Sequence, residues 1–236
     1  MNSIKWSRLG RYIATTFRHV IPQVSKGDEG AYYCEADNKL GQTGKAMLNM
    51  KVLYGPQVVV KKHEEVDEGA SLSVKCEAIA NPRPTSFEWI RADNQTFKSF
   101  GQVLKLKMIS NEQSGDYTCI VKNILKLSDG SERERFGNAT IKVYVRHRPG
   151  PSKISPADPV GITEKRISLS CDPHPKGYPK PQYRWYKSDN PSATLATSRE
   201  LTIPRVTIKN EGQYNCIATN GLGEGAPGHA YLKVIY

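Results

Sequence analysis

The sequence has no run of apolar residues approaching the roughly 18 that a transmembrane helix needs. It also has no sustained helical period, no Gly-rich phosphate loop, no H-E-x-x-H motif and no nucleophile elbow. The five histidines are scattered along the chain, and no C-x-x-C pair occurs. We therefore predict a protein that is not an enzyme and that uses no cofactor and no metal.

The chain has little charge imbalance in any one region, although its net charge is +11. Lys and Arg outnumber Asp and Glu by 8 to 4 in residues 1–54, by 14 to 12 in 55–146 and by 12 to 7 in 147–236. Basic residues alternate with acidic and apolar ones, as on solvated sheet faces. This pattern predicts no nucleic-acid partner, and it leaves a polyanion site, for example for heparan sulfate, as the less favoured alternative.

What the sequence does contain is one pattern, Gly-x-Tyr-x-Cys, at residues 30–34, 115–119 and 212–216. A tryptophan with an apolar residue two positions earlier precedes each copy. The Cys-to-Cys spacings of 85 and 97 residues indicate modules of about 100 residues, which suits an all-β sandwich. The core positions predicted from this repeat are Trp6, Trp89, Trp185, Tyr32, Tyr117 and Tyr214.

Four of the five cysteines are related by near-equal spacings. Cys76 and Cys119 are 43 residues apart, and Cys171 and Cys216 are 45 apart. These spans predict two equivalent disulfides and hence an oxidising compartment. Cys34 is left without a partner.

The order Cys…Trp…Cys, with Tyr two residues before the second Cys, is typical of the immunoglobulin sandwich. We predict tandem immunoglobulin-like Greek-key β-sandwiches of I-set type, with domains at 54–146 and 147–236. The tyrosine hydroxyl should bond the backbone at the corner before its strand, and Gly115 and Gly212 should form the tight turn. Asp28 stands two residues before Gly30 in the first copy, and Gln113 and Asn210 replace it in the other copies, so we expect a weaker corner salt bridge or cap there.

Residues 1–53 resemble only the second half of such a domain, strands C to G. Strands A and B would precede Met1, and the missing strands would explain why Cys34 has no partner. A sandwich lacking these strands should leave half of its inner face wet.

The hairpin between the last two strands is longest in the second domain. The asparagine that follows the second cysteine and the alanine that opens the last strand are 16 positions apart in this domain (Asn123 to Ala139). The same two positions are 8 and 10 residues apart in the other copies. We predict a recognition loop formed by Lys126, Arg133, Arg135 and Phe136. The alternative is a longer hairpin that binds nothing.

Two N-glycosylation sequons occur, at Asn94 and at Asn138. Together with the paired cysteines they favour secretion. The Pro-rich segment 172–181 could serve as a polyproline II ligand, but we expect it only to shape the connection between two strands.

The stretches 123–150 and 181–185 resemble Echinoid and Friend of Echinoid, a family of arthropod adhesion proteins, and the similarity extends over most of the chain. The resemblance implies an ectodomain fragment that binds itself or related immunoglobulin-superfamily adhesion proteins such as Neuroglian. It also implies a membrane-anchored parent at the cell surface, at cell junctions. The alternatives are the ectodomain of an immunoglobulin-bearing receptor kinase and a set of intracellular muscle modules.

Overall fold

A computed structural model describes residues 3–236, and these residues form strands joined by turns and loops, with three single-turn 3-10 helices among them. The prediction of an all-β fold is confirmed. The first sheet has the order β2-β1-β3-β4, and all of its neighbouring pairs are antiparallel. Its strands are β1 (Ser3–Arg8), β2 (Arg11–Ala14), β3 (Gly30–Asp37) and β4 (Thr43–Met50).

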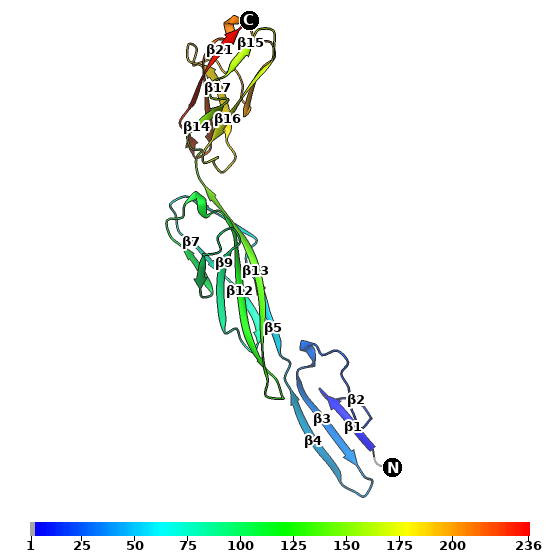
Figure 1. The fold of residues 1–236 in the computed structure, drawn as a ribbon. Coiled ribbons are helices and arrows are strands. Elements are labelled where there is room, and N and C mark those ends of the chain that lie inside the picture. The colour runs from blue at the N-terminus through cyan, green and yellow to red at the C-terminus, as the bar shows by residue number, and fades with distance from the viewer. Residues whose placement is uncertain (1–2) are drawn as a thin grey trace. The chain divides into compact units, whose positions relative to one another are not determined.

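Residues 54–146 contribute a five-stranded sheet of order β10-β9-β12-β13-β6 and two strand pairs, β11-β7 and β5-β8. Figure 1 shows β12 and β13 as two long strands lying side by side. The strands are β5 (Tyr54–Val59), β6 (His63–Asp67), β7 (Leu72–Lys75), β8 (Glu77–Asn81), β9 (Ser86–Arg91), β10 (Lys98–Phe100), β11 (Val103–Leu106), β12 (Gly115–Lys126) and β13 (Glu132–Arg146).

Residues 147–236 form two further sheets, of order β14-β16-β18 and β15-β21-β19-β17, with β20 paired to β19. Their strands are β14 (Ser152–Ser155), β15 (Val160–Ile162), β16 (Ile167–Pro173), β17 (Gln182–Lys187), β18 (Glu200–Ile203), β19 (Gly212–Asn220), β20 (Gly223–Glu224) and β21 (Gly228–Ile235). The three 3-10 helices are η1 (Lys26–Asp28), η2 (Asn111–Gln113) and η3 (Ile208–Asn210), each just before a Gly-x-Tyr-x-Cys strand.

The chain divides into two compact units. One comprises the chain up to Val59 with residues 77–88 and 120–138, and the other comprises 60–76, 89–119 and 139–236. Because the residues between 54 and 146 belong partly to each unit, these units do not outline the three domains expected from the sequence. Those domain boundaries stay a prediction.

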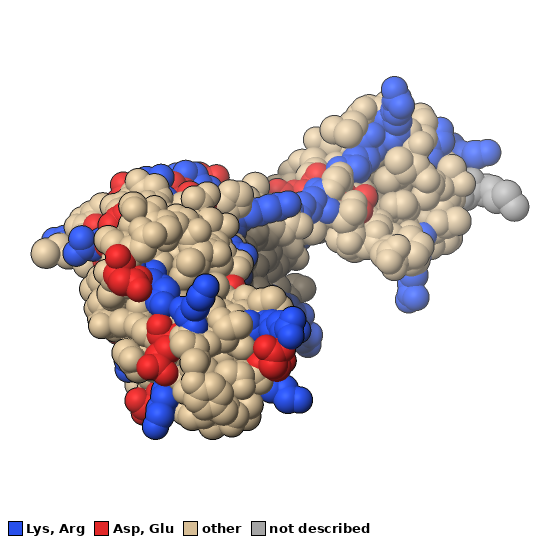
Figure 2. Space-filling view, turned by 90° about the horizontal axis from the view of Figure 1, so that it is seen from above, with Lys and Arg blue, Asp and Glu red and all other residues tan. Residues whose placement is uncertain are grey.

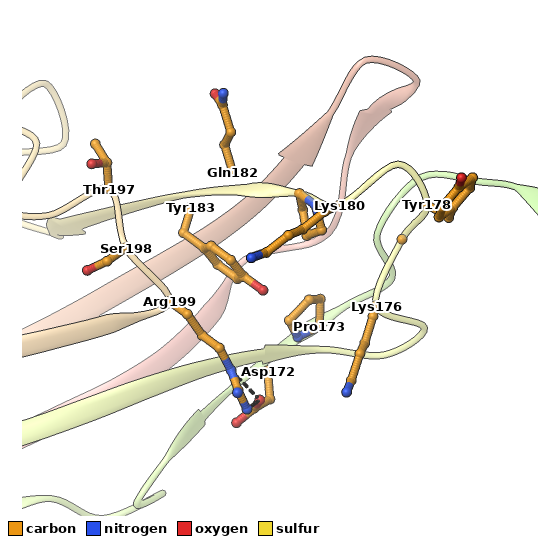
Figure 3. Close-up of a pocket in the computed structure, with 12 residues that line it drawn as sticks. Asp172, Pro173, Lys176, Tyr178, Lys180, Gln182, Tyr183, Thr197, Ser198 and Arg199 are labelled. Atoms are coloured by element: carbon orange, nitrogen blue, oxygen red, sulfur yellow. Dashed lines mark hydrogen bonds and ion pairs between the residues drawn. The ribbon is translucent and has the colours of Figure 1, made fainter.

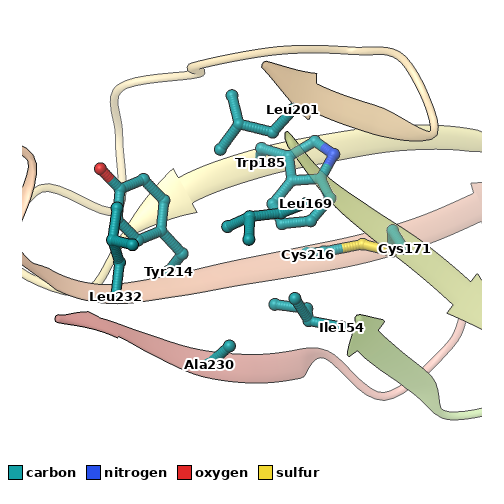
Figure 4. Close-up of a cluster of buried hydrophobic side chains, with 9 residues drawn as sticks. All are labelled: Ile154, Leu169, Cys171, Trp185, Leu201, Tyr214, Cys216, Ala230 and Leu232. Atoms are coloured by element: carbon teal, nitrogen blue, oxygen red, sulfur yellow. A yellow bond between two sulfur atoms is a disulfide. The ribbon is translucent and has the colours of Figure 1, made fainter. Parts of the chain in front are cut away.

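Two disulfides are present: Cys76, between β7 and β8, bonds Cys119 of β12, and Cys171 of β16 bonds Cys216 of β19. Around the second bridge the side chains of Trp185, Leu169 and Leu232 are fully buried, as Figure 4 shows. Trp185 also donates a hydrogen bond from Nε1 to the Ser198 carbonyl (3.0 Å). Full burial of each large apolar side chain stabilises the fold by about 1.5–3 kcal/mol, so this cluster stabilises residues 147–236.

The corner before each of these strands has the same construction in all three copies. Each tyrosine donates its hydroxyl hydrogen to the backbone carbonyl four residues earlier: Tyr32 to Asp28 (2.8 Å), Tyr117 to Gln113 (2.9 Å) and Tyr214 to Asn210 (2.8 Å). Burial raises the pKa of Tyr117 and of Tyr214. The glycine two residues before each tyrosine has a positive φ between 132° and 144°, which L side chains rarely adopt. The tight turn predicted at these glycines is therefore present.

The cap that the sequence predicts to be weaker in the second and third copies is present in all three copies. Asp28 accepts hydrogen bonds from the Ser25 backbone N–H (2.7 Å) and hydroxyl (2.8 Å). Gln113 accepts the equivalent backbone bond at 2.9 Å and Asn210 accepts it at 2.7 Å. An amide oxygen accepts these hydrogen bonds as a carboxylate oxygen does, so the substitution removes the charge and keeps the cap.

A basic side chain two residues after each tryptophan closes the same corner. It donates to the carbonyls on both sides of the capping residue: Arg8 to Gly27 and Glu29, Arg91 to Glu112 and Ser114, and Lys187 to Lys209 and Glu211. The cation also lies 5.1–5.6 Å from the centre of the corner tyrosine ring in each copy. Each corner thus combines a tyrosine hydrogen bond, a cap and a cation.

Arg91 is the most deeply buried of these three cations, with 8% of its surface exposed. Its guanidinium donates to both carboxylate oxygens of Asp93, at 2.9 and 2.6 Å. This hydrogen bonding raises the pKa of Arg91 and lowers that of Asp93. The ion pair offsets the cost of taking the guanidinium out of water.

The first sheet differs from the rest in how its tryptophan is covered. Trp6 is half-buried, whereas Trp89 and Trp185 have no exposed surface. The His19 ring centre lies 6.1 Å from the ring centres of both Trp6 and Tyr32. Cys34 carries a free thiol and is also half-buried. The inner face of this sheet is therefore partly exposed, as the sequence predicts.

The charge difference at the caps makes their acid response testable. The hydrogen bonds from Ser25 hold the pKa of Asp28 below its ordinary value of 3.8. A carboxyl group with a lowered folded pKa adds stability above its unfolded pKa and loses this contribution as the pH falls through the folded value. We expect the turn at residues 25–28 to open in acid below about pH 4, while the amide-capped turns persist.

This response is measured by following the backbone N–H resonances of Ser25, Ser110 and Thr207 in a pH titration. The variant Asp28→Asn should keep the cap and abolish the titration at Ser25. Equal acid shifts at all three N–H groups would contradict the assignment.

The corner cation should matter for stability. Lys187→Met leaves two backbone carbonyls without their charged donor, and we expect the free energy of unfolding to fall by about 2 kcal/mol. Lys233→Met, at an exposed position of β21, is the control. Urea unfolding followed by tryptophan fluorescence measures both, and equal losses in the two variants would contradict a role for the corner.

Candidate recognition surface

The segment predicted as a recognition loop is mostly strand. β12 continues to Lys126 and β13 begins at Glu132, so the connection itself is only Leu127–Ser131. This turn is closed by hydrogen bonds from Leu127 N–H to the Ser131 carbonyl (2.8 Å) and from Gly130 N–H to the Leu127 carbonyl (3.0 Å). The prediction of a loop at Arg133, Arg135 and Phe136 is therefore corrected to a rigid strand.

The strand also separates the predicted contact residues. Side chains alternate between the two faces of a strand, so Arg133 and Arg135 share one face of β13 with the buried Ile141. Phe136 points to the opposite, outer face, together with Asn138. The predicted basic and aromatic residues therefore do not form one site.

Charges on the outer face of the hairpin are paired. Lys122 forms an ion pair with Glu134 (2.9 Å), and Lys126 forms one with Glu132 (3.4 Å). These exposed pairs contribute little to stability, but they balance the charge of this face. Thr118 and Thr140 share a hydroxyl hydrogen bond of 2.8 Å further along.

The opposite face carries the two arginines and is close to β5. Arg135 packs over Gly55, where an added Cβ would lie 3.0 Å from the arginine Cβ. At Gly137 an added Cβ would collide with the carbonyl oxygen of Pro56 and lie 3.0 Å from a methyl group of Val58. Glycine at 137 thus allows β13 to approach the β5 backbone. We name the exposed side chains of Arg133 and Arg135 the arginine face.

A second surface feature is a hollow of about 710 Å³ in residues 172–199. In Figure 3 the Lys180 side chain points toward Tyr183, whereas the Lys176 side chain points away from it. Arg199 donates from Nε to Asp172 (3.1 Å), and this hydrogen bond raises the pKa of Arg199. The Pro-rich segment 172–181 forms one wall, so it shapes a surface. Figure 2 shows basic and acidic side chains interspersed on the face nearest the viewer.

Both predicted glycosylation sites are exposed. Asn94 lies in the turn between β9 and β10, where its Oδ1 accepts hydrogen bonds from the Thr96 hydroxyl (2.7 Å) and backbone N–H (3.1 Å). Asn138 lies on β13 itself. Either amide nitrogen can be reached from solvent.

With the sandwich geometry established, comparison with known proteins identifies the family. A model of the immunoglobulin domain matches residues 56–123 and 150–220, more than half of the chain. The chain belongs to the immunoglobulin-domain family. The tandem immunoglobulin-like fold predicted from the Cys…Trp…Cys order is thereby confirmed.

Relatives of this immunoglobulin-domain chain are long proteins. It is 27% identical over 233 residues to human MAM domain-containing glycosylphosphatidylinositol anchor protein 2, covering 87% of this chain and 23% of the relative. It is 29% identical over 222 residues to mouse hemicentin-1, covering 86% of this chain and 4% of the relative. The chain thus spans less than a quarter of the length of these two relatives.

A solved complex of Dpr2 Ig1-Ig2 with DIP-Theta Ig1-Ig3 contains a chain of the same fold, with a TM-score of 0.61 and 18% sequence identity. The similarity covers 99% of this chain and 90% of that one. Within residues 3–236, no helix is long and apolar enough to cross a membrane. The same residues contain no group of three or more His, Cys, Asp or Glu side chains placed to hold a metal ion.

The sequence interpretation missed one residue that organises these immunoglobulin domains. The asparagine four positions after the second cysteine donates two hydrogen bonds that tie the start of the domain to the connection before the tryptophan strand. Asn123 donates to Tyr54 (3.0 Å) and Pro82 (2.8 Å), and Asn220 donates to His147 and Pro179 (both 2.9 Å). Its recurrence at a fixed distance from the cysteine was the available signal.

The close approach at Gly137 gives a stability test. Gly137→Ala forces β13 and β5 apart, and we expect a loss of about 1–3 kcal/mol in the free energy of unfolding. Gly221→Ala is the control, because an added Cβ there has nothing within 4 Å. Thermal or urea unfolding measures both variants, and a neutral Gly137→Ala would show that the strands need no such contact.

Proposed function

We propose that this chain is part of an extracellular recognition protein that binds other immunoglobulin-domain proteins, including copies of itself, and performs no catalysis. The observation that carries the proposal is the pair of family domains, each closed by a buried disulfide. Such bridges persist in oxidising compartments and are rare in the cytosol. They favour an extracellular setting over intracellular muscle modules.

The relatives support this setting. The name of the human relative describes a glycosylphosphatidylinositol anchor protein, and the solved complex joins immunoglobulin domains of two different proteins. By analogy we propose that the parent of this chain is anchored to the plasma membrane and acts at cell junctions. Because the fold hosts many functions, the proposed membership of the Echinoid and Friend of Echinoid family rests on the resemblance at residues 123–150 and 181–185.

The arginine face is the surface we propose for contact. Among the described residues, neither Arg133 nor Arg135 forms an ion pair, whereas Lys122 and Lys126 on the other face are each paired with a glutamate. The two arginines are therefore available to acidic groups of a partner. Arginine is enriched at protein interfaces because its planar guanidinium can form several hydrogen bonds at once.

The experiment replaces both arginines with glutamate. We expect self-association of the secreted chain, measured by bead aggregation and sedimentation, to weaken about tenfold or more, which corresponds to roughly 1.4 kcal/mol. The variant Lys105→Glu with Lys107→Glu makes the same charge change at two other exposed positions and is the control. Association unchanged by the arginine replacements would remove this face from consideration, and no association in the unaltered chain would contradict homophilic binding.

A further inference from the structure

The outer face of β13 presents an aromatic ring beside a sequon asparagine. Phe136 is 61% exposed and Asn138 is exposed as well. Side chains two residues apart on a strand share a face, and their positions lie about 7 Å apart. The two side chains therefore stand next to each other in the order Phe-x-Asn-x-Thr.

The neighbours of this pair on the same face are already engaged. Glu132 and Glu134 form ion pairs with lysines of β12, and Thr140 bonds Thr118. Within residues 3–236 neither the Phe136 ring nor the Asn138 side chain has a hydrogen bond, ion pair or ring contact. An exposed phenylalanine on a strand is thus left with most of its surface in water.

Gly137 fixes which way the pair points. The side of β13 to which residue 137 faces lies against the Pro56 carbonyl, as described above. The strand therefore cannot rotate to bury Phe136 on that side. The short side chain at 137 and the pairing of β13 with β12 hold Phe136 and Asn138 outward together.

We propose that Asn138 carries an N-linked glycan and that the first N-acetylglucosamine lies on the ring of Phe136. One face of this sugar carries axial C–H groups with slight positive charge, and the face of an aromatic ring is negative. Stacking the two removes apolar surface of the phenylalanine from water. The ring is then a support for the glycan, and the proposal assigns it no protein partner.

The bond-forming step is ordinary group transfer. The Asn138 amide nitrogen attacks the anomeric carbon of an oligosaccharide carried on a lipid diphosphate. The new carbon–nitrogen bond replaces the carbon–oxygen bond, the lipid diphosphate leaves, and the amide loses one proton. No atom is oxidised or reduced, and the glycan donor is the only co-substrate.

The other sequon is an internal control. Two positions before Asn94 stands Ala92, which offers no ring. A glycan at Asn94 therefore lacks a ring two positions earlier, and the nearby Phe97 ring is already packed against Tyr117 (5.4 Å between ring centres). The inference rests on the extracellular setting proposed above, since glycans of this kind are attached to secreted proteins. It also leaves the arginine face, on the opposite side of the hairpin, free for a partner.

The test uses the chain secreted from animal cells. Glycopeptide mass spectrometry should find a glycan on Asn138. After trimming to one N-acetylglucosamine, proton NMR should show its ring protons shifted upfield and close to the Phe136 ring. Phe136→Leu, which keeps an apolar side chain without a ring, should abolish both signals. A sugar at Asn94 should show neither.

Thermal unfolding gives the second readout. Removal of the Asn138 glycan by N-glycosidase should lower Tm by about 4 °C with phenylalanine at 136. It should lower Tm by less than about 1 °C in the Phe136→Leu variant. Equal losses in both backgrounds, or an Asn138 sugar without contact to the ring, would overturn the proposal.

The outcomes separate this inference from the proposed function. A glycan at Asn94 with Asn138 unmodified overturns the inference alone. Unmodified asparagine at both positions overturns it and also opposes the extracellular setting. A glycosylated, ring-stacked chain that fails to bind any immunoglobulin-domain partner overturns the proposed recognition role and leaves the inference standing.

Discussion

The contact on which this structure depends is a disulfide packed against a buried tryptophan between two sheets. In residues 147–236 the Cys171–Cys216 bridge and Trp185 are without exposed surface, and strands of both sheets close around them. In the loop-entropy model a bridge over 45 residues stabilises the fold by roughly 4 kcal/mol. The corner tyrosine and its cation then fix the strand that carries the second cysteine.

The first sheet shows what this contact provides, because the same corner is present there without it. Tyr32, Arg8 and Asp28 make the corner bonds, yet Trp6 stays half-buried and Cys34 is a free thiol. The corner is thus a local structure that forms from its own residues. Burial of the tryptophan needs a second sheet across from it, which residues 3–53 do not supply.

Much of the fold could be predicted from the sequence because its signals are local and repeated. The cysteine spacings and the Tyr two residues before the second cysteine identify the sandwich. The carbonyl that accepts the tyrosine hydrogen bond lies only four residues earlier in the chain. At the cap, Gln113 and Asn210 accept the same backbone bond as Asp28 because the bond needs only an oxygen, and only Asp28 adds a charge. The corner cation was missed because the position holds arginine in two copies and lysine in the third, so no single residue type recurs there.

The recognition segment was the least predictable part. Hairpin length shows that residues have been added, but it does not show whether they pair as strand. Once Glu132 and Glu134 pair across the hairpin, the period-two alternation sends Arg133 and Arg135 to one face and Phe136 to the other. The hairpin therefore offers two different surfaces, one basic and one aromatic, and the proposals for a partner and for a glycan use them separately.

The central claim is that the bridged tryptophan contact, rather than the shared corner, gives these domains their stability. Native-state hydrogen exchange measures it directly, by comparing the backbone amides of β3, β12 and β19. We expect strong protection in β12 and β19 and much faster exchange in β3, because only the first two pack against a buried tryptophan and disulfide. Equal protection in all three strands would contradict it.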